Sequence, residues 1–219
     1  MRGRKPVSDR RAPGWTERGS ARNAAGGYAG EGRVEKNMIY LDNAATTPMC
    51  EEARREMAPF LEARFDNPSA QHALGRDARA AVGKARRQVA AAICCEPGEV
   101  YFTSGGTESD NWALLGAAFA NRDKSRHLIS SAVEHPAVIK SLEWLKRQGF
   151  EVTLLPVDPM GRVNPEQVRA AIRTDTILVS IMAANNEIGT LQPVAEIGRA
   201  ARERGILFHT DAVQAVGAI

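Results

Sequence analysis

The alternation of strand-like and helix-like segments after residue 98 constrains the fold of this chain most strongly. Short apolar runs alternate there with longer segments whose apolar residues recur at helical spacing. This alternation predicts an α/β fold, with a mostly parallel sheet and helices on both of its faces. We expect strands at 100–103, 127–132, 151–157, 176–183 and 206–210, separated by helices at 107–120, 136–147, 164–173 and 193–204.

The part of the chain before residue 98 divides into two regions of different composition. Residues 1–36 are rich in Arg, Gly and Ala and lack apolar periodicity, which predicts a disordered basic extension without a catalytic role. Two helical patterns follow between residues 50 and 93. Their apolar positions are Cys50, Ala53, Met57 and Phe60 or Leu61 in the first pattern, and Ala78, Val82, Ala85, Val89 and Ile93 in the second.

Composition excludes several classes of function. No apolar run approaches the roughly 18 residues of a membrane-spanning helix, so no membrane association is expected. The net charge is +3, and no basic stripe with interleaved aromatic residues follows the first 36 residues, which argues against nucleic acid. The sequence has three cysteines, which lack metal-ligand spacing, so we expect neither a disulfide framework nor a metal site. The absence of a disulfide framework predicts a cytoplasmic location.

The ends of the predicted strands carry the candidate binding residues, because ligands of parallel α/β sheets bind outside the carboxyl ends of the strands. In Ser104–Thr107, two glycines precede a predicted helix. Gly106 would let the backbone approach a phosphate closely, and Thr107 would add a hydroxyl. The alternative is a plain glycine turn. Neither a dinucleotide fingerprint nor a P-loop is present, which disfavours nucleotide binding.

Three further polar segments follow later strands, and each has a functional and a structural interpretation. His135 could stack on a flat ligand or transfer a proton, or it could be a structural histidine. Asn186 lies in "NNEIG", which could bind a ligand oxygen or simply form a turn. Asp211, with Gln214 after it, could keep the ring nitrogen of pyridoxal phosphate protonated, or could cap the next segment.

Taken together, the motifs resemble the NifS/IscS-type cysteine desulfurases, class V aminotransferase-group enzymes of pyridoxal-phosphate fold type I. The resemblance covers about residues 38–219 and rests on "YLDNAATTP", "NPSAQHALG", "TSGGTESDN", "VEHPAV", "NNEIG" and "HTDAVQAVG". It implies that residues 37–219 form the N-terminal part of a cofactor-binding large domain. It also implies conversion of L-cysteine to L-alanine, with a persulfide on a catalytic cysteine that supplies iron–sulfur scaffold or sulfur-acceptor proteins, in a full-length form that is a homodimer.

The resemblance also implies a role for each candidate residue. Gly106 and Thr107 would hold the cofactor phosphate. His135 would stack on the pyridine ring and assist proton transfer. Asn186 would lie near the phenolic oxygen and the substrate. Asp211 would pair with the pyridine nitrogen, and Gln214 would contact the phenolic oxygen.

Two family features are absent from the sequence. The Ser-x-His-Lys segment, whose lysine binds the cofactor covalently, does not occur, and neither does the catalytic cysteine loop. Cys50, Cys94 and Cys95 are interpreted as packing residues rather than sulfur acceptors. We therefore expect this chain to be a fragment that retains much of the non-covalent cofactor site without completing the reaction by itself.

Other interpretations remain open at this stage. A related enzyme of the same cofactor group, such as a selenocysteine lyase, an aminotransferase or a kynureninase-like hydrolase, would share most of the motifs. A non-catalytic scaffold that binds assembly partners or dimerises is the second alternative, and the missing lysine favours it.

Overall fold

The structure, a computed structural model, describes residues 39–218. The extension predicted at 1–36 lies outside the described residues. The described chain forms two compact units, which we call the helical unit (residue 39 and Glu52–Tyr101) and the sheet unit (Tyr40–Glu51 and 102–218). Each unit is described by itself.

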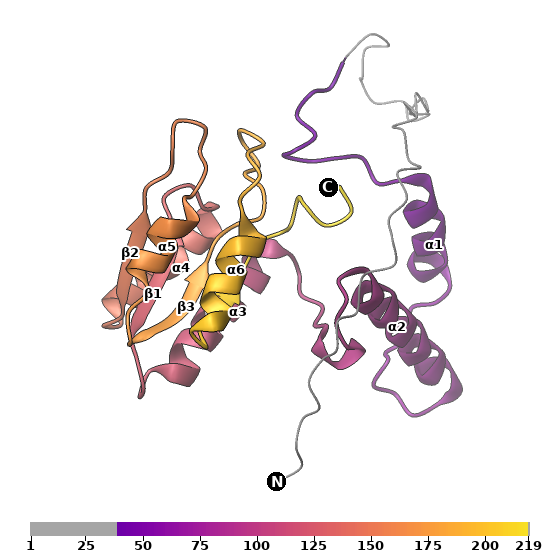
Figure 1. The fold of residues 1–219 in the computed structure, drawn as a ribbon. Coiled ribbons are helices and arrows are strands. Elements are labelled where there is room, and N and C mark those ends of the chain that lie inside the picture. The colour runs from indigo at the N-terminus through magenta and orange to yellow at the C-terminus, as the bar shows by residue number, and fades with distance from the viewer. Residues whose placement is uncertain (1–38, 219) are drawn as a thin grey trace. The chain divides into compact units, whose positions relative to one another are not determined.

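The sheet unit is built on four parallel strands (Figure 1). These are β1 (His127–Ser131), β2 (Glu151–Leu155), β3 (Thr176–Ser180) and β4 (Leu207–His209), in the spatial order β2-β1-β3-β4. Leu128 of β1 lies opposite Val152 of β2 and Leu178 of β3. The predicted parallel sheet is thus confirmed, and its carboxyl ends lie along one edge, as parallel pairing requires.

Helices cover both faces of this sheet (Figure 1). Leu128 and Leu178 pack with α3 (Gly106–Asn121) and α4 (Pro136–Arg147) on one face. The neighbouring residues Ile129 and Val179 pack with α5 (Pro165–Ala171) and α6 (Val194–Glu203) on the other. Adjacent strand residues point to opposite faces, which is why nearly continuous apolar runs suit strands buried on both sides.

The predicted helix boundaries follow from local capping chemistry. Asn164 caps α5, since its side chain accepts a hydrogen bond from Glu166 N at 2.9 Å, and Pro165 takes the first helical position. Gly149 and Gly205, which follow α4 and α6, both have positive φ, as predicted for glycines at helix C-termini.

The strand predicted at 100–103 is wrong. Its backbone caps the short 3₁₀ helix η1 (Pro97–Glu99) instead of joining the sheet, because Val100 N donates to Pro97 O. Val100 O in turn accepts from Arg86 Nε at 3.1 Å. With these groups already paired, residue 100 has no backbone group left for a ladder, although its side chain is buried as a strand residue would be.

The helical unit contains α2 (Ala73–Ala92), η1 and all but the first residue of α1 (Glu51–Glu62). No residue of α1 is buried, and α2 buries only Gly75 and Ala90. Helices form where the sequence predicted them, with their apolar faces largely exposed. None of the helices within 39–218 is long and apolar enough to cross a membrane.

Replacing His127 at the start of β1 is expected to destabilise the sheet unit. Its buried ring lies 2.7 Å from Thr176 Oγ1 and 2.8 Å from Thr153 Oγ1, so it joins three strands. His127→Ala should lower the free energy of unfolding by about 2–3 kcal/mol, through lost packing and unpaired hydroxyls. Urea unfolding measures this, with the exposed Lys140→Ala as control. Equal stability of the two variants would contradict it.

The stabilising effect of His127 should also depend on pH. Burial, followed by the nearby Arg173, lowers its pKa from 6.5. A histidine with a lowered pKa in the folded state contributes stability above the unfolded pKa and loses it as the pH falls below about 6.5.

Candidate functional site

A cavity of about 250 Å³ lies in the sheet unit, where the N-terminus of α3 meets the segments that follow β1, β3 and β4. This is the edge at which parallel α/β sheets bind ligands. All of the residues selected from the sequence line this one cavity: Gly106, Thr107, His135, Asn186, Asp211 and Gln214. Residues separated by more than 100 positions in the chain therefore meet at a single site.

The N-terminus of α3 forms one end of the cavity. Gly105 precedes the helix in an extended conformation, and no side chain caps its first N–H groups. A Cβ added to Gly106 would lie only 2.6 Å from Cγ2 of Val213, so the close approach of the segment after β4 requires glycine here. Uncapped N–H groups at the start of a helix favour an anion, and the exposed Thr107 adds a hydroxyl.

Glu108 stabilises this turn from outside the cavity. Its Oε2 accepts hydrogen bonds from both N and Oγ of Ser104, each at 2.6 Å. The hydroxyl bond, followed by the backbone bond, lowers the pKa of this exposed carboxyl. Glu108 thus fixes the entry to α3 without occupying the N–H groups that face an incoming anion.

His135 forms the N-cap of α4 and also lines the cavity. Its Nδ1 accepts a hydrogen bond from Ala137 N at 3.1 Å, which fixes the orientation of the half-buried ring. Because Nδ1 is the acceptor, the neutral ring carries its proton on Nε2. The capping bond and the position at the cavity therefore belong to the same side chain, and the cap orients the imidazole.

Asp211 and Gln214 extend from the segment after β4. One oxygen of Asp211 accepts from Val213 N at 3.0 Å, so it forms the local turn considered above and also faces the cavity. Gln214 Nε2 donates to Ala45 O at 3.0 Å, which joins residues 45 and 214 across the lining. These bonds hold a carboxylate and an amide at fixed positions.

The two adjacent asparagines have different environments. Asn185 is buried and forms the turn, because its Oδ1 accepts from Glu187 N at 2.9 Å and Ile188 N at 3.0 Å, while its Nδ2 donates to Val133 O at 3.0 Å. Asn186 is half-buried and lines the cavity. Turn formation and the position in the cavity are therefore divided between the two residues.

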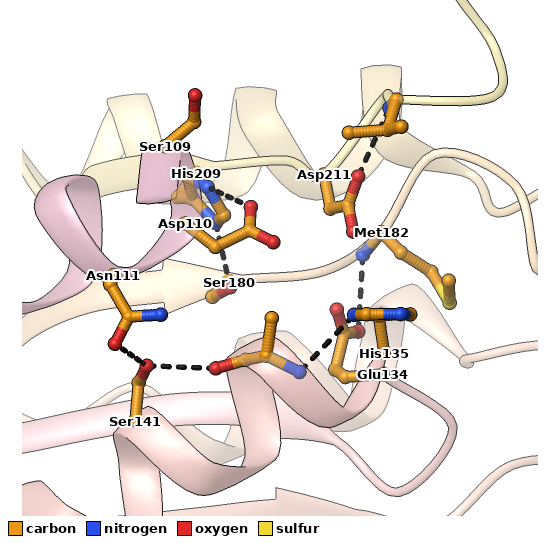
Figure 2. Close-up of polar contacts among 12 residues, drawn as sticks. Ser109, Asp110, Asn111, Glu134, His135, Ser141, Ser180, Met182, His209 and Asp211 are labelled. Carbon is orange, nitrogen blue, oxygen red and sulfur yellow. Dashed lines mark hydrogen bonds and ion pairs between the residues drawn. The ribbon is translucent and has the colours of Figure 1, made fainter. Parts of the chain in front are cut away.

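A buried polar network that the sequence analysis missed adjoins the cavity (Figure 2). Asp110 is 3% exposed and lies 3.5 Å from Nε2 of His209, whose Nδ1 is 2.8 Å from Ser180 Oγ. Asp110 also lines the cavity, one helical turn beyond Gly106. The i, i+4 spacing of Gly106 and Asp110 could have indicated that Asp110 lines the same cavity, because it places both residues on one face of α3.

Asp110, His135 and Asp211 lie close enough together to be considered as metal ligands. One possible ligand atom from each falls within 4.8 Å of the others. Asp110 already pairs with His209, however, and Asp211 accepts from Val213 N. Together with the uncapped helix start at the same cavity, this favours an organic ligand that carries an anionic group over a bare cation.

Glu134, which directly precedes His135, is a second buried acid that the sequence analysis missed. Its Oε1 accepts from Ser131 Oγ at 2.5 Å and from Met182 N at 3.0 Å, whereas Oε2 has no hydrogen-bond partner among the described residues. Burial raises the pKa of this carboxyl to about 7, against the opposing effect of the two hydrogen bonds. Figure 2 shows it beneath the ring of His135.

Comparison with known proteins decides the family. The model of the family described as "Aminotransferase class-V" matches residues 39–219. The chain belongs to the class-V aminotransferase family. Among its curated relatives, the cysteine desulfurase IscS of Methanosarcina thermophila is 55% identical over 184 residues, which are 84% of this chain and 46% of that protein. The chain thus spans about half the length of the curated relatives it matches.

Solved structures agree with this assignment. A NifS-like protein is 40% identical, with a TM-score of 0.78, over 82% of this chain and 50% of that one. A structure of SspA in complex with cysteine is 39% identical, with a TM-score of 0.75, over 79% of this chain and 50% of that one. The resemblance predicted from the motifs, and the α/β fold that it implied, are both confirmed.

The cysteines of this chain differ from their predicted environment. Cys50 and Cys94 are exposed and Cys95 is half-buried, so the packing role predicted for the first two is not found. Cys94 has a φ of 57° just after α2, a conformation that turns the chain out of the helix. No cysteine and no lysine is among the residues that line the cavity.

Proposed function

We propose that this chain carries the cofactor-binding cavity of a pyridoxal 5′-phosphate-dependent cysteine desulfurase. The activity would remove sulfur from L-cysteine, giving L-alanine and an enzyme persulfide for iron–sulfur scaffold or sulfur-acceptor proteins. The observation that carries the proposal is the meeting of an uncapped helix start, a fixed imidazole and a carboxylate in one cavity. The 55% identical relative named cysteine desulfurase and the related SspA structure with cysteine support this substrate.

The phosphate end of the cofactor fits the start of α3. A phosphate needs several N–H donors and close backbone approach, and Gly106 with the uncapped first turn supplies both. The hydroxyl of Thr107 would add another donor. Glu108 is held by Ser104, outside this set of donors.

The pyridine ring of the cofactor fits the cavity residues that follow the strands. Asp211 would pair with the pyridine nitrogen, His135 would stack on the ring, and Gln214 and Asn186 would contact the phenolic oxygen and the substrate. When bound, pyridoxal phosphate supplies an electron sink to the reaction, and a carboxylate beside the ring nitrogen maintains it. The Nε2 proton of His135, opposite the nitrogen fixed by Ala137, is the one available for transfer.

Further properties of the whole enzyme are part of the same proposal. A homodimeric full-length form and a cytoplasmic location are consistent with the family assignment and with the three free cysteines. Contact with iron–sulfur scaffold or sulfur-acceptor proteins would follow from the persulfide product. The part of the proposal that can be tested with this chain by itself is binding of the phosphorylated pyridine ring.

Replacing Asp211 tests the proposed ring site. The probe is pyridoxine 5′-phosphate, because this alcohol cannot react with surface lysines as an aldehyde would. Asp211→Ala should weaken its binding by about 10- to 100-fold, which corresponds to one charge-assisted hydrogen bond. Isothermal titration calorimetry measures the affinity, and Asp123→Asn, a change at a carboxylate whose side chain is 92% exposed, is the control. Absence of binding to the unmodified chain would contradict the proposal.

A further inference from the structure

Glu134 connects two turns that come from different strands. The first turn follows β1, and Ser131, the last residue of that strand, donates from Oγ to Glu134 Oε1. The second follows β3, and its Met182 N donates to the same oxygen at 3.0 Å. The acid is only 6% exposed, so water does not readily replace either donor.

A second bond joins the same pair of turns. Asn185 Nδ2 donates to Val133 O at 3.0 Å, immediately before Glu134. The first turn presents His135 to the cavity, and the second presents Asn186. The relative position of these two cavity residues therefore depends on a side-chain bond at Glu134 and another at Asn185.

Burial, rather than the charges around it, favours the neutral form of Glu134. Burial raises the pKa of Glu134 most strongly. The hydrogen bonds from Ser131 and Met182 and then the nearby His209 of β4 lower it, and the like charge of Asp211, after β4, adds the smallest effect, which raises it. His209 is itself paired with Asp110 of α3. Since Oε2 has no partner within the described chain, an ionised Glu134 would leave a buried negative oxygen uncompensated near Asp211.

We propose that Glu134 is a positioning residue, whose buried carboxyl holds the turn of His135 against the turn of Asn186 and so shapes the ring-binding side of the cavity. This inference rests on the proposed function, because it assigns the cavity to a phosphorylated pyridine. Glu134 acts through its neighbours and is not among the residues that line the cavity. Its ionisation at higher pH should loosen the joined turns and weaken ring binding.

Two substitutions separate the hydrogen bonds from the charge. Glu134→Ala removes both bonds and should weaken binding of pyridoxine 5′-phosphate by at least about 10-fold at pH 6 and at pH 8. Glu134→Gln keeps an acceptor oxygen without an ionisable group, so it should bind within about 3-fold of the unmodified chain at pH 6. Between pH 6 and pH 8 the unmodified chain should lose more affinity than Glu134→Gln. The ligand phosphate titrates equally in both, so the difference reports Glu134.

The control is Glu143→Gln, which changes an exposed acid on α4, the helix that His135 caps. It should follow the unmodified chain at both pH values. Unchanged binding in Glu134→Ala, with binding still reduced in Asp211→Ala, would overturn the positioning role and leave the proposed function intact. Identical pH profiles for the unmodified chain and Glu134→Gln would also overturn it.

Nuclear magnetic resonance gives a readout that does not depend on the ligand. The ¹³C shift of the Glu134 carboxyl should titrate near pH 7. The protection of the Met182 amide from hydrogen exchange, relative to its intrinsic rate at each pH, should fall above that pH in the unmodified chain but not in Glu134→Gln. A midpoint near the ordinary glutamate value, with constant protection of the Met182 amide, would overturn the inference. This measurement also decides whether Glu134 joins the two turns if Glu134→Ala does not fold.

Discussion

Gly106→Val is expected to reduce binding of phosphorylated ring ligands by at least about 30-fold. A Cβ at this position would already lie 2.6 Å from Cγ2 of Val213, and valine adds two methyl groups to that contact. Overpacking of this kind costs about 1–3 kcal/mol, and a 30-fold change in affinity corresponds to about 2 kcal/mol. The strain falls on the first turn of α3 and on the segment of Asp211, so both ends of the cavity move. Calorimetry with pyridoxine 5′-phosphate measures the loss.

Two variants show whether this effect comes from the contact with Val213. Gly116→Ala changes a glycine in the same helix, where the nearest atom to an added Cβ is Trp112 Cδ1 at 3.9 Å. It should leave binding unchanged and stabilise the helix by about 0.5–1 kcal/mol. Val213→Ala in the Gly106→Val background removes the opposing methyls and should restore part of the affinity. If Gly106→Val bound the ligand normally, the phosphate site would have to lie elsewhere.

The parts of the fold that local chemistry determines were predicted well from the sequence. The boundaries of α4 agree because His135 and Pro136 begin the helix and Gly149 follows its end, all within one segment. The strands β1 and β3 were also predicted from local sequence, because each is a short apolar run that is buried throughout. The strand predicted at 100–103 failed because its backbone is capped by Pro97 and Arg86, and sequence periodicity does not report which backbone groups pair.

The candidate site was predictable to the extent that parallel topology determines it. The polar residues after β1, β3 and β4 had to meet at one edge, and His135, Asn186 and Asp211 line one cavity there. Their roles toward a cofactor remain predictions. Asp110, His209 and Glu134 were missed because their significance lies in contacts across elements. Asp110 meets His209 from α3 to β4, and Glu134 meets Met182 across 48 positions of the chain.

Two interpretations that seemed to compete in the sequence are compatible in the structure. Asp211 forms a local turn with Val213 N and also faces the cavity, and His135 caps α4 while it lines the same space. A residue held by a backbone bond loses little conformational entropy when a ligand arrives, so the structural role supports the binding role. A capping motif at the carboxyl end of a parallel strand is therefore no argument against function.

The free energy of unfolding should fall by about 3 kcal/mol with rising pH because of Glu134 alone. Its pKa is about 7 in the folded chain and has the ordinary value of 4.5 when exposed. Below about pH 4.5 the carboxyl is protonated in both states and causes no loss. Between these values the unfolded chain releases the proton while the folded chain retains it, so stability decreases as the pH rises. Above about pH 7 the full difference is reached, which corresponds to about 3 kcal/mol.

Comparison with Glu134→Gln isolates this contribution from the other acids. Glu108 and Asp175 have lowered pKa values, because they accept hydrogen bonds from Ser104 and Arg173, and they therefore favour the folded state at higher pH. They are present in both proteins and cancel in the difference. Urea unfolding at intervals from pH 4.5 to pH 8 should show the unmodified chain losing stability relative to Glu134→Gln, with most of the change complete by about pH 7. A difference that stays constant over this range would mean that Glu134 ionises freely in the folded chain, and its buried position between Ser131 and Met182 would then fail to explain its behaviour.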